Sequence, residues 1–333
     1  MQLQFQNNRV GKVAEATCRN FLLFILASVF VFAMVGCPIS TTTPKTELAW
    51  ADVLEQSPNP KVVTDADFLA RITATGLPWR VKDKSSGIEM LLVPPGKFVM
   101  GMSPGGSSLD SELPAHEVTL TKPFYLGRTE VTQPQWVKVA GNNPSSFHNP
   151  DRHRNSMIEK LMNEGLTKSE AEAKAANDSI EIDSFPVERV SWNDCQQFCA
   201  KTKLRLPTEA EWEYACRAGV RKPTYGALDD IAWLDTNSSG TTHIVGKKLP
   251  NALGFYDMLG NVCEWCSDIF DSGFYKSCED GVVDPKGASE ASERVLRGGC
   301  WAFHFTGCRS STRINFDPDG RYDIVGFRVA RTP

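Results

Sequence analysis

The chain has 333 residues, enough for one large domain or two ordinary ones. Its formal net charge of −4 is mildly acidic, which excludes the broad basic surface that nucleic-acid-binding proteins carry. Eight tryptophans and 25 glycines favour an irregular globule rich in loops over a helical bundle.

The first 36 residues predict an export signal. Arg9, Lys12 and Arg19 form a basic region, and residues 21–35 form an apolar run that is short for a membrane span. The run ends in MVGC, which resembles the lipobox of bacterial lipoproteins, with Cys37 as the residue that would be lipidated after cleavage. Several acyl chains on one cysteine give stable anchoring in a membrane. A plain secretory signal or a short anchor helix is the alternative.

Residues 37–48 are polar and rich in proline and threonine, so we expect a flexible tether. The proline that follows the lipobox cysteine favours the outer membrane, and the predicted location is the bacterial cell surface. Residues 49–87 read as a lead-in segment with a short amphipathic piece at 65–75. The folded domain is expected to span residues 88–333.

Four short strands are predicted at the start of this domain. Their residues are apolar or alternate between apolar and polar, and turn-forming residues separate them. The strands are expected at residues 90–93, 97–102, 116–120 and 124–127.

Two main helices follow, and each has an N-terminal signal. Asn193 or Asp194 is expected to begin the first, which runs to Lys201. Thr208 and Glu211 have the spacing of a capping box and predict the start of the second. Residues 155–177, upstream of both, are rich in Glu, Lys and Ala and predict a solvated helical hairpin inserted at the surface.

Eight cysteines remain after Cys18 in the signal and Cys37 are set aside. An even number permits disulfides in an exported protein, although their pairing does not follow from the sequence. Cys263 and Cys266 have the CxxC spacing of a redox dithiol, but no second such pair and no neighbouring histidine supports a zinc site.

Two kinds of position alternate between residues 297 and 328. We call the first kind the frame residues. They include glycines, which permit close backbone approach, and arginines, whose planar forks can tie loops together with several hydrogen bonds. The frame residues are Arg297, Gly298, Gly299, Trp301, Cys308, Arg309, Ser310, Ser311, Arg313, Pro318, Arg321, Gly326, Phe327 and Arg328.

The second kind, the unconstrained positions, shows no period of 2 or 3.6 residues that would assign it to a core face. A rigid frame that holds a varied, aromatic-rich set of loops suits a binding surface. An ordinary C-terminal loop with a few buried aromatic residues is the alternative. The sixteen unconstrained positions are Ala302, Phe303, His304, Phe305, Thr306, Gly307, Thr312, Ile314, Asn315, Phe316, Asp317, Asp319, Gly320, Tyr322, Asp323 and Ile324.

Long motifs connect the chain to a known family. In chain order they read GKFVMG, HEVTLTKPFYLGRTEVT, FPVERVSWNDCQQFC, RLPTEAEWEYACRAG, GFYDMLGNVCEW, RVLRGGCW and GFRVA, and they span residues 88–331. In these motifs the chain resembles the formylglycine-generating-enzyme, or sulfatase-modifying-factor, family. The resemblance implies an α+β fold, a loop-rich variant of the C-type lectin fold with two main helices and short antiparallel strands.

The enzymes of this family use two C-terminal cysteines, five residues apart, to hold copper and react with oxygen. Cys308 matches the second of them, but Phe303 stands at the first, and Cys300 lies eight residues before Cys308. One thiolate does not reproduce a two-thiolate copper(I) site, so we predict no enzymatic activity. A copper- and oxygen-dependent formylglycine-generating oxidase that uses Cys300 and Cys308 is the alternative.

A second resemblance is to the variable proteins of diversity-generating retroelements, which carry diversified residues at the C-terminus of this same domain. Randomised adenines in Asn-type codons cannot yield Lys, Glu, Gln, Met or Trp, and none of these occurs at the unconstrained positions. This resemblance implies a surface lipoprotein that binds a protein or cell-surface ligand through a variable region at 297–328. A scaffold lipoprotein without a diversified site is a further alternative.

The expected ligand contacts are drawn from the unconstrained positions, with aromatic rings as anchors. They are Ala302, Phe303, His304, Phe305, Thr306, Thr312, Ile314, Asn315, Phe316, Asp317, Asp319, Tyr322 and Asp323. The family also binds calcium, and the resemblance assigns Asn261 and Glu264, whose oxygens suit a hard cation, as candidate ligands. Hydrogen bonds that tie loops together are the alternative role of these two side chains.

Overall fold

The computed structural model describes residues 47–105, 109–148, 150–176 and 184–333. The predicted signal, the lipidation site Cys37 and nearly all of the tether lie outside these residues. From Lys45 to Pro333 the chain forms one compact unit. Within the described ranges, no helix has the length and apolar character needed to cross a bilayer.

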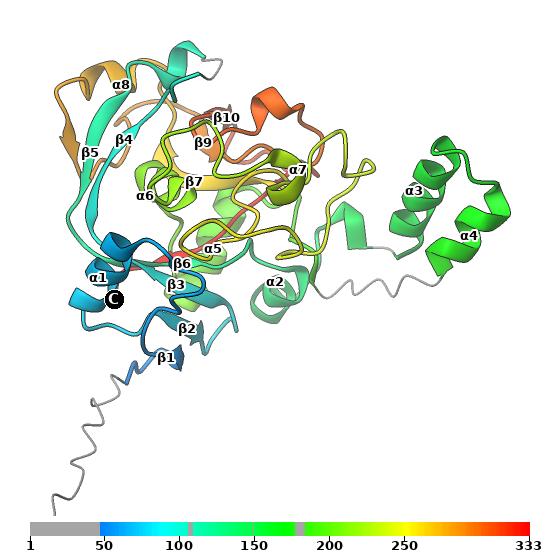
Figure 1. Ribbon diagram of the computed structural model, residues 1–333, viewed down its shortest axis with the longest axis horizontal. Helices are drawn as coiled ribbons and strands as arrows, with labels where there is room; N and C mark the ends of the chain where they lie inside the picture. The colour runs from blue at the N-terminus through cyan, green and yellow to red at the C-terminus, as the bar shows by residue number, and fades with distance from the viewer. Residues whose placement is uncertain (1–46, 106–108, 149, 177–183) are drawn as a thin grey trace, which may run out of the picture. The chain divides into compact units, whose positions relative to one another are not determined.

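A five-stranded antiparallel sheet includes the lead-in segment (Figure 1). In sheet order its strands are β1 (Ala51–Glu55), β2 (Arg80–Asp83), β3 (Glu89–Val93), β6 (Phe124–Gly127) and β12 (Ala330–Arg331). Asp65 caps α1 (Ala66–Ala74), and the side chains of Phe68 and Ile72 on this helix join the core. The lead-in segment therefore belongs to the same fold, and the predicted boundary at residue 88 is not a boundary in the structure.

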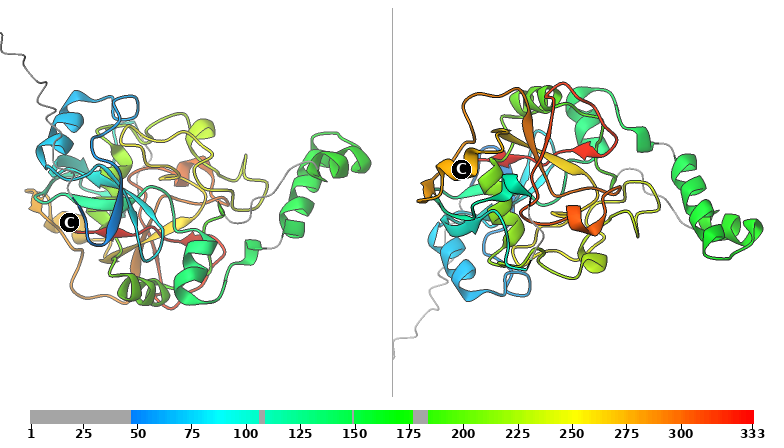
Figure 2. Two further views of the ribbon diagram at one scale, coloured as in Figure 1. Left: turned by 90° about the horizontal axis from the view of Figure 1, so that it is seen from below. Right: turned by 90° about the horizontal axis from the view of Figure 1, so that it is seen from above.

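A four-stranded sheet carries the C-terminal stretch. Its order is β10 (Ile314–Phe316), β9 (Arg294–Arg297), β7 (Cys263–Ile269) and β11 (Val325–Gly326). β11 and β12, both near the C-terminus and drawn in red, lie in different sheets and so connect the two (Figures 1 and 2). β11 runs parallel to β7, so the prediction of antiparallel strands fails at this pair.

A three-stranded sheet completes the set with β4 (Gly96–Met100), β5 (His116–Leu120) and β8 (Val282–Val283). β8 is parallel to β5. The four strands predicted from the sequence are all present as β3, β4, β5 and β6.

The α+β prediction with two main helices is confirmed by α5 (Trp192–Thr202) and α6 (Glu209–Arg217). Thr208 and Glu211 form the predicted capping box of α6. α5 begins at Trp192, one residue before Asn193 and two before Asp194, because Ser191 is its N-cap. Asp194 is the third helical residue, and its side chain accepts a hydrogen bond from the Ser191 N–H.

The remaining helices are short or lie in the insertion. α3 (Pro150–Asn163) and α4 (Lys168–Ala176) form the predicted helical hairpin and contact each other. The hairpin begins at Pro150, five residues before the predicted start at residue 155. The others are α2 (Gln133–Ala140), α7 (Leu228–Ile231), α8 (Phe274–Ser277) and the 3₁₀ turns η1 (Asp110–Glu112), η2 (Ser146–His148) and η4 (Phe305–Gly307).

Candidate functional site

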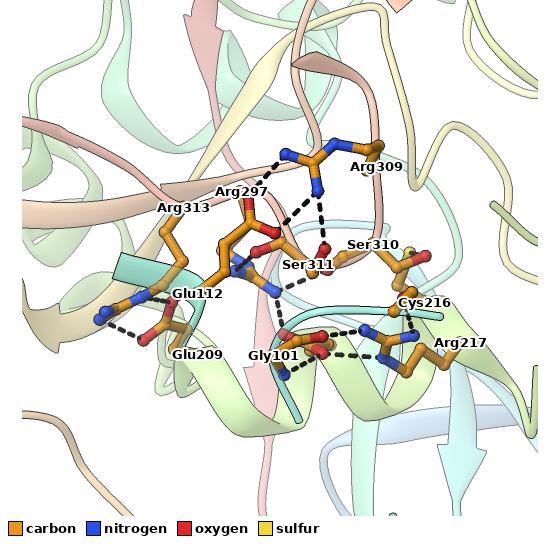
Figure 3. Close-up of polar contacts among 12 residues, drawn as sticks. Gly101, Glu112, Glu209, Cys216, Arg217, Arg297, Arg309, Ser310, Ser311 and Arg313 are labelled. Atoms are coloured by element: carbon orange, nitrogen blue, oxygen red, sulfur yellow. Dashed lines mark hydrogen bonds and ion pairs between the residues drawn. The ribbon is translucent and has the colours of Figure 1, made fainter. Parts of the chain in front are cut away.

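The helix α6 turns a buried, charged face toward the frame residues. Glu209, Glu213 and Arg217 lie four residues apart and therefore share one side of the helix. Figure 3 shows Glu209 and Arg217. All three are buried. Arg217 donates to the Glu213 carboxylate at 2.8 Å and to the carbonyl of Gly101 at 2.7 Å. Two buried glutamates against one arginine need further cations, because an unpaired buried charge is costly.

Two frame arginines supply those cations (Figure 3). Arg297, at the end of β9, donates to Glu213 and Glu209, and Arg313 makes two bonds to Glu209 at 2.7 and 3.0 Å. Burial alone would lower the pKa of Arg297, but the neighbouring acids, Glu213 first, raise it above its ordinary value. Burial alone would raise the pKa of Glu209, but the charges of Arg313 and Arg297 hold this pKa below its ordinary value. Arg297 and Glu209 therefore each stabilise the charged form of the other.

Frame arginines also hold the main chain of the loops. Arg297 donates to the carbonyl oxygens of Ser310 at 2.6 Å and Ser311 at 3.1 Å. Arg309 pairs with Glu112 at 2.6 and 2.7 Å and donates to the carbonyl of Thr306 at 2.7 Å. A bond to a carbonyl oxygen does not depend on which side chain the residue carries. At Thr306, an unconstrained position, the bond from Arg309 therefore fixes the main chain without constraining the side chain.

A second anchor holds the end of the C-terminal stretch. Arg328 makes two bonds of 2.6 Å to the Glu264 carboxylate and donates to the carbonyl of Gly127 at 3.1 Å. Trp212 on α6 donates its indole N–H to the same carboxylate at 2.7 Å. Both Arg328 and Glu264 are fully buried. This pair connects the C-terminal stretch to β7 and α6.

Burial separates the frame residues from the unconstrained positions. All frame residues are buried except Trp301, Pro318 and Arg321. Of the unconstrained positions, only Thr312 is buried, and the others are exposed or half-buried. The side chains of Phe305 and Tyr322 are 52% and 42% exposed, which is high for aromatic residues. The pattern read from the sequence thus corresponds to two sets of residues with opposite solvent contact.

The exposed residues form two groups. In the first, the rings of His304 and Phe305 lie 4.0 Å apart, and the backbone N–H of Asp235 donates to the carbonyl of Phe303. In the second, the rings of Phe316 and Tyr322 lie 4.6 Å apart.

Trp301 joins the two groups. Its indole N–H donates to the carbonyl of Asp323 at 3.1 Å, and its own carbonyl accepts from Ser238. Residues outside the C-terminal stretch also reach the second group, since Asn193 donates to Asp319 and Glu293 accepts from Asn315. Sequence reasoning missed Asn193 and Glu293 because only the fold brings them there.

Thr312 is a correction to the predicted contacts. Its side chain is 3% exposed, and its neighbours Ser311 and Arg313 are also buried. It is therefore not available to a ligand at the surface. The other twelve predicted contacts remain accessible at least in part.

The predicted calcium ligands do not fit a shared cation. The amide of Asn261 exchanges hydrogen bonds with the backbone of His243, at 2.9 and 3.2 Å. The carboxylate of Glu264 is already neutralised by Arg328. Their oxygens therefore tie loops together, which was the alternative role. Across the described ranges, no group of three or more His, Cys, Asp or Glu side chains is arranged to hold a metal ion.

Next to Glu264 lies a pair of acids that sequence reasoning missed. Glu130 and Asp257 are buried, and both oxygens of Glu130 and one of Asp257 lack a hydrogen-bond partner. Burial, followed by Asp257 and Glu264, raises the pKa of Glu130 well above its ordinary value. Burial also raises the pKa of Asp257 to about 6. No motif in the sequence predicts this pair, because the two acids are removed from water only when the chain folds.

The cysteines considered for oxidase chemistry are buried. Cys300 and Cys308 have no exposed surface, and Phe303 is half-buried at the position of the missing cysteine. Burial raises the pKa of Cys308 to about 12, which disfavours the thiolate that reacts and binds metals. Cys263 and Cys266 lie three apart on β7 and so point to opposite faces of the sheet, which does not suit a dithiol. All eight described cysteines are free thiols.

Known sequences show which proteins the chain is similar to. Residues 75–333 match the model of the sulfatase-modifying factor enzyme 1-like domain. The chain is 32% identical to the formylglycine-generating enzyme of Streptomyces coelicolor, over 72% of this chain and 87% of that protein. It is 26% identical to the inactive C-alpha-formylglycine-generating enzyme 2 of Bos taurus, over 76% and 91%. It is also 32% identical to the serine/threonine-protein kinase pkn1 of Chlamydia caviae but spans 39% of its length.

Two solved structures are similar in fold. Treponema denticola variable protein 1 is 27% identical, with a TM-score of 0.57, and the match covers 74% of this chain and 95% of that one. PvdO from Pseudomonas aeruginosa is 26% identical, with a TM-score of 0.58 and coverage of 76% and 98%.

Proposed function

The chain belongs to the family of sulfatase-modifying factor enzyme 1-like domains, and from this premise we propose that it is a surface-displayed lipoprotein that binds a ligand without transforming it. The unconstrained positions would form the contact surface. The predicted partner is a protein or another cell-surface structure. Lipidation at Cys37 would hold the domain at the outer membrane.

One observation carries this proposal. The buried arginines of the frame are bound to buried acids and to main-chain carbonyls, whereas the side chains at all unconstrained positions except Thr312 reach solvent at least in part. Large, rigid aromatic side chains give much contact area for little loss of conformational entropy. The exposed Phe305 and Tyr322 are therefore suited to be the anchors. The likeness to a treponemal variable protein supports the same proposal at the level of the fold.

Enzymatic oxidation remains a second candidate, because relatives named as formylglycine-generating enzymes are similar over most of the chain. The buried thiols of Cys300 and Cys308 and the phenylalanine at position 303 favour binding over oxidation. Incubation with copper, oxygen and a sulfatase-derived cysteine peptide separates the two. We expect the peptide thiol to survive, and formation of a peptide aldehyde would refute a purely binding role.

Binding can be tested before the natural ligand is known. Peptides would be selected from a displayed random library on the immobilised protein. We expect the selected peptides to lose at least tenfold in affinity for a variant with F305A and Y322A, because hot-spot aromatics carry about 2 kcal/mol or more. D52N, on the exposed edge strand β1, is the matched control. If the selected peptides bind the variant with F305A and Y322A as tightly as they bind D52N, the contact surface lies elsewhere.

The diversification part of the proposal has a genomic test. We expect a near-identical template repeat beside a reverse-transcriptase gene, which differs from the codons for residues 300–325 only at adenines. A genome without such a cassette would contradict diversification and favour the scaffold alternative.

A further inference from the structure

Glu188 is a buried acid directly beside the second group of exposed residues. It has no exposed surface, and its neighbour Arg189 donates a backbone N–H to the carbonyl of Tyr322 at 3.0 Å. One carboxylate oxygen of Glu188 accepts from the N–H of Phe147 at 2.8 Å. The other oxygen, Oε2, is buried without a hydrogen-bond partner. An unsatisfied buried oxygen is costly and calls for a reason.

The charges that face Glu188 are unbalanced. From the C-terminal stretch, Asp323 repels it, and the cation of Arg189 acts in the opposite sense. The Arg189 guanidinium lies at the surface and donates to the Ser146 hydroxyl at 3.2 Å. The amides of Ser146 and Phe147 also stabilise the Glu188 carboxylate. The arginine that offsets the charge of Glu188 is therefore exposed and also bonded to Ser146.

The residues close to Asp323 in the sequence also carry an excess of negative charge. Asp317 and Asp319 are exposed, and the nearby Arg321 is already neutralised by two bonds of 2.8 Å to Asp194. The exposed ring of Tyr322 lies between these acids in the sequence. Aromatic faces attract cations, and the attraction adds to that of carboxylates.

We infer that the second group of exposed residues binds a cationic group, the guanidinium or ammonium of a basic protein segment, with Asp323 in contact at the surface and Glu188 behind it. This inference rests on the proposed function, since it names the chemistry of the ligand for the same face. Asp323 is an unconstrained position and Glu188 is not, so the preference combines a side chain from the loops with one from the scaffold.

The inference has a pH signature. Burial raises the pKa of Glu188 to about 7, with Asp323 acting in the same direction and the amides of Phe147 and Ser146 and the charge of Arg189 opposing. A bound cation favours the ionised carboxylate. Affinity for a cationic ligand therefore increases as the pH rises from 6 to 8. A purely structural role of Glu188 would not produce this profile.

The test uses the protein with fluorescein-labelled hexa-arginine and hexa-glutamate peptides in a fluorescence-anisotropy titration. We expect hexa-arginine to bind, with an affinity at pH 8 at least threefold that at pH 6. D323N and E188Q should each weaken binding at pH 8 at least fivefold, and E188Q should remove the difference between the two pH values. D52N, far along the chain on β1, should behave as the wild type. Equal melting temperatures would establish that E188Q is folded.

Absence of hexa-arginine binding, or binding that E188Q and D323N leave unchanged, overturns the inference. The outcome is distinguishable from failure of the proposed function. If library-selected neutral or acidic peptides lose affinity with F305A and Y322A while hexa-arginine does not bind, the binding face stands and the cationic preference is wrong.

Discussion

At the scale of single residues, the frame depends on ion pairs that have no contact with water. Glu209 receives bonds from both Arg297 and Arg313, and all three side chains are buried. Such pairs contribute little compared with apolar residues of the same shape, but loss of one partner leaves an uncompensated charge. Their main effect here is to fix the position of the loops.

Replacing Glu209 with glutamine should therefore be strongly destabilising. We expect a loss of about 3–5 kcal/mol in the free energy of unfolding, measured by urea denaturation. T306A, at an exposed position, is the control and should change it by less than about 0.5 kcal/mol. A loss below about 1 kcal/mol for E209Q would mean that the network relaxes or admits water.

The two kinds of C-terminal position should also respond differently to truncation. F327A removes a fully buried ring and should cost about 3–5 kcal/mol of stability. F305A removes a ring that is 52% exposed, so we expect a change below about 1 kcal/mol in stability. Thermal unfolding of both variants checks this. Comparable losses would contradict the division into frame residues and unconstrained positions.

At the scale of elements, local patterns in the sequence predicted those helices and strands whose positions depend on neighbouring residues. The capping box at Thr208 and Glu211 located α6, and alternating residues located β3 to β6. The start of α5 was misplaced by one or two residues because serine, asparagine and aspartate all cap helices, and three such residues lie within positions 191–194.

The pairing of strands that lie far apart in the sequence could not be predicted from such local patterns. The parallel pair of β7 and β11 joins residues about sixty positions apart, and two residues on each strand are too few to show a pattern. The candidate face was predictable, apart from Thr312, because frame residues and unconstrained positions differ in residue type. The contributions of Asn193, Glu293 and Glu188 were not, because they come from other elements.

The lead-in segment provides a prediction at this scale. β1 pairs with β2 at the edge of the five-stranded sheet, and Arg71 of α1 donates to the Tyr214 hydroxyl at 2.7 Å. A chain that begins at residue 75, where the family match begins, loses these contacts. We expect it to melt at a clearly lower temperature than a chain that begins at residue 45. Identical melting curves would show that β1 and α1 are dispensable.

At the scale of the whole molecule, several buried acids hold protons near neutral pH. Burial, with Glu209 as a further cause, raises the pKa of Asp268 to about 7, and burial raises that of Asp257 to about 6. The folded protein therefore binds more protons than the unfolded chain between about pH 4 and pH 7. This contribution to stability is complete below the unfolded pKa and is lost as the pH rises through the folded values.

We therefore expect the melting temperature to fall as the pH is raised from 5 to 8, as measured by differential scanning calorimetry. Glu209 acts in the opposite sense, because its lowered pKa stabilises the fold only above the unfolded value, so losses from this acid begin below about pH 4. D268N should flatten the decrease between pH 5 and 8. A melting temperature that increases over this interval would mean that the raised acids do not dominate.

The loops are held at their carbonyl oxygens, by Arg297 at Ser310, by Arg309 at Thr306 and by Trp301 at Asp323. Thr306 and Asp323 are unconstrained positions, and every amino acid has the same carbonyl, so a different side chain at either position leaves these hydrogen bonds in place. Replacement of either side chain should therefore leave the path of its loop unchanged.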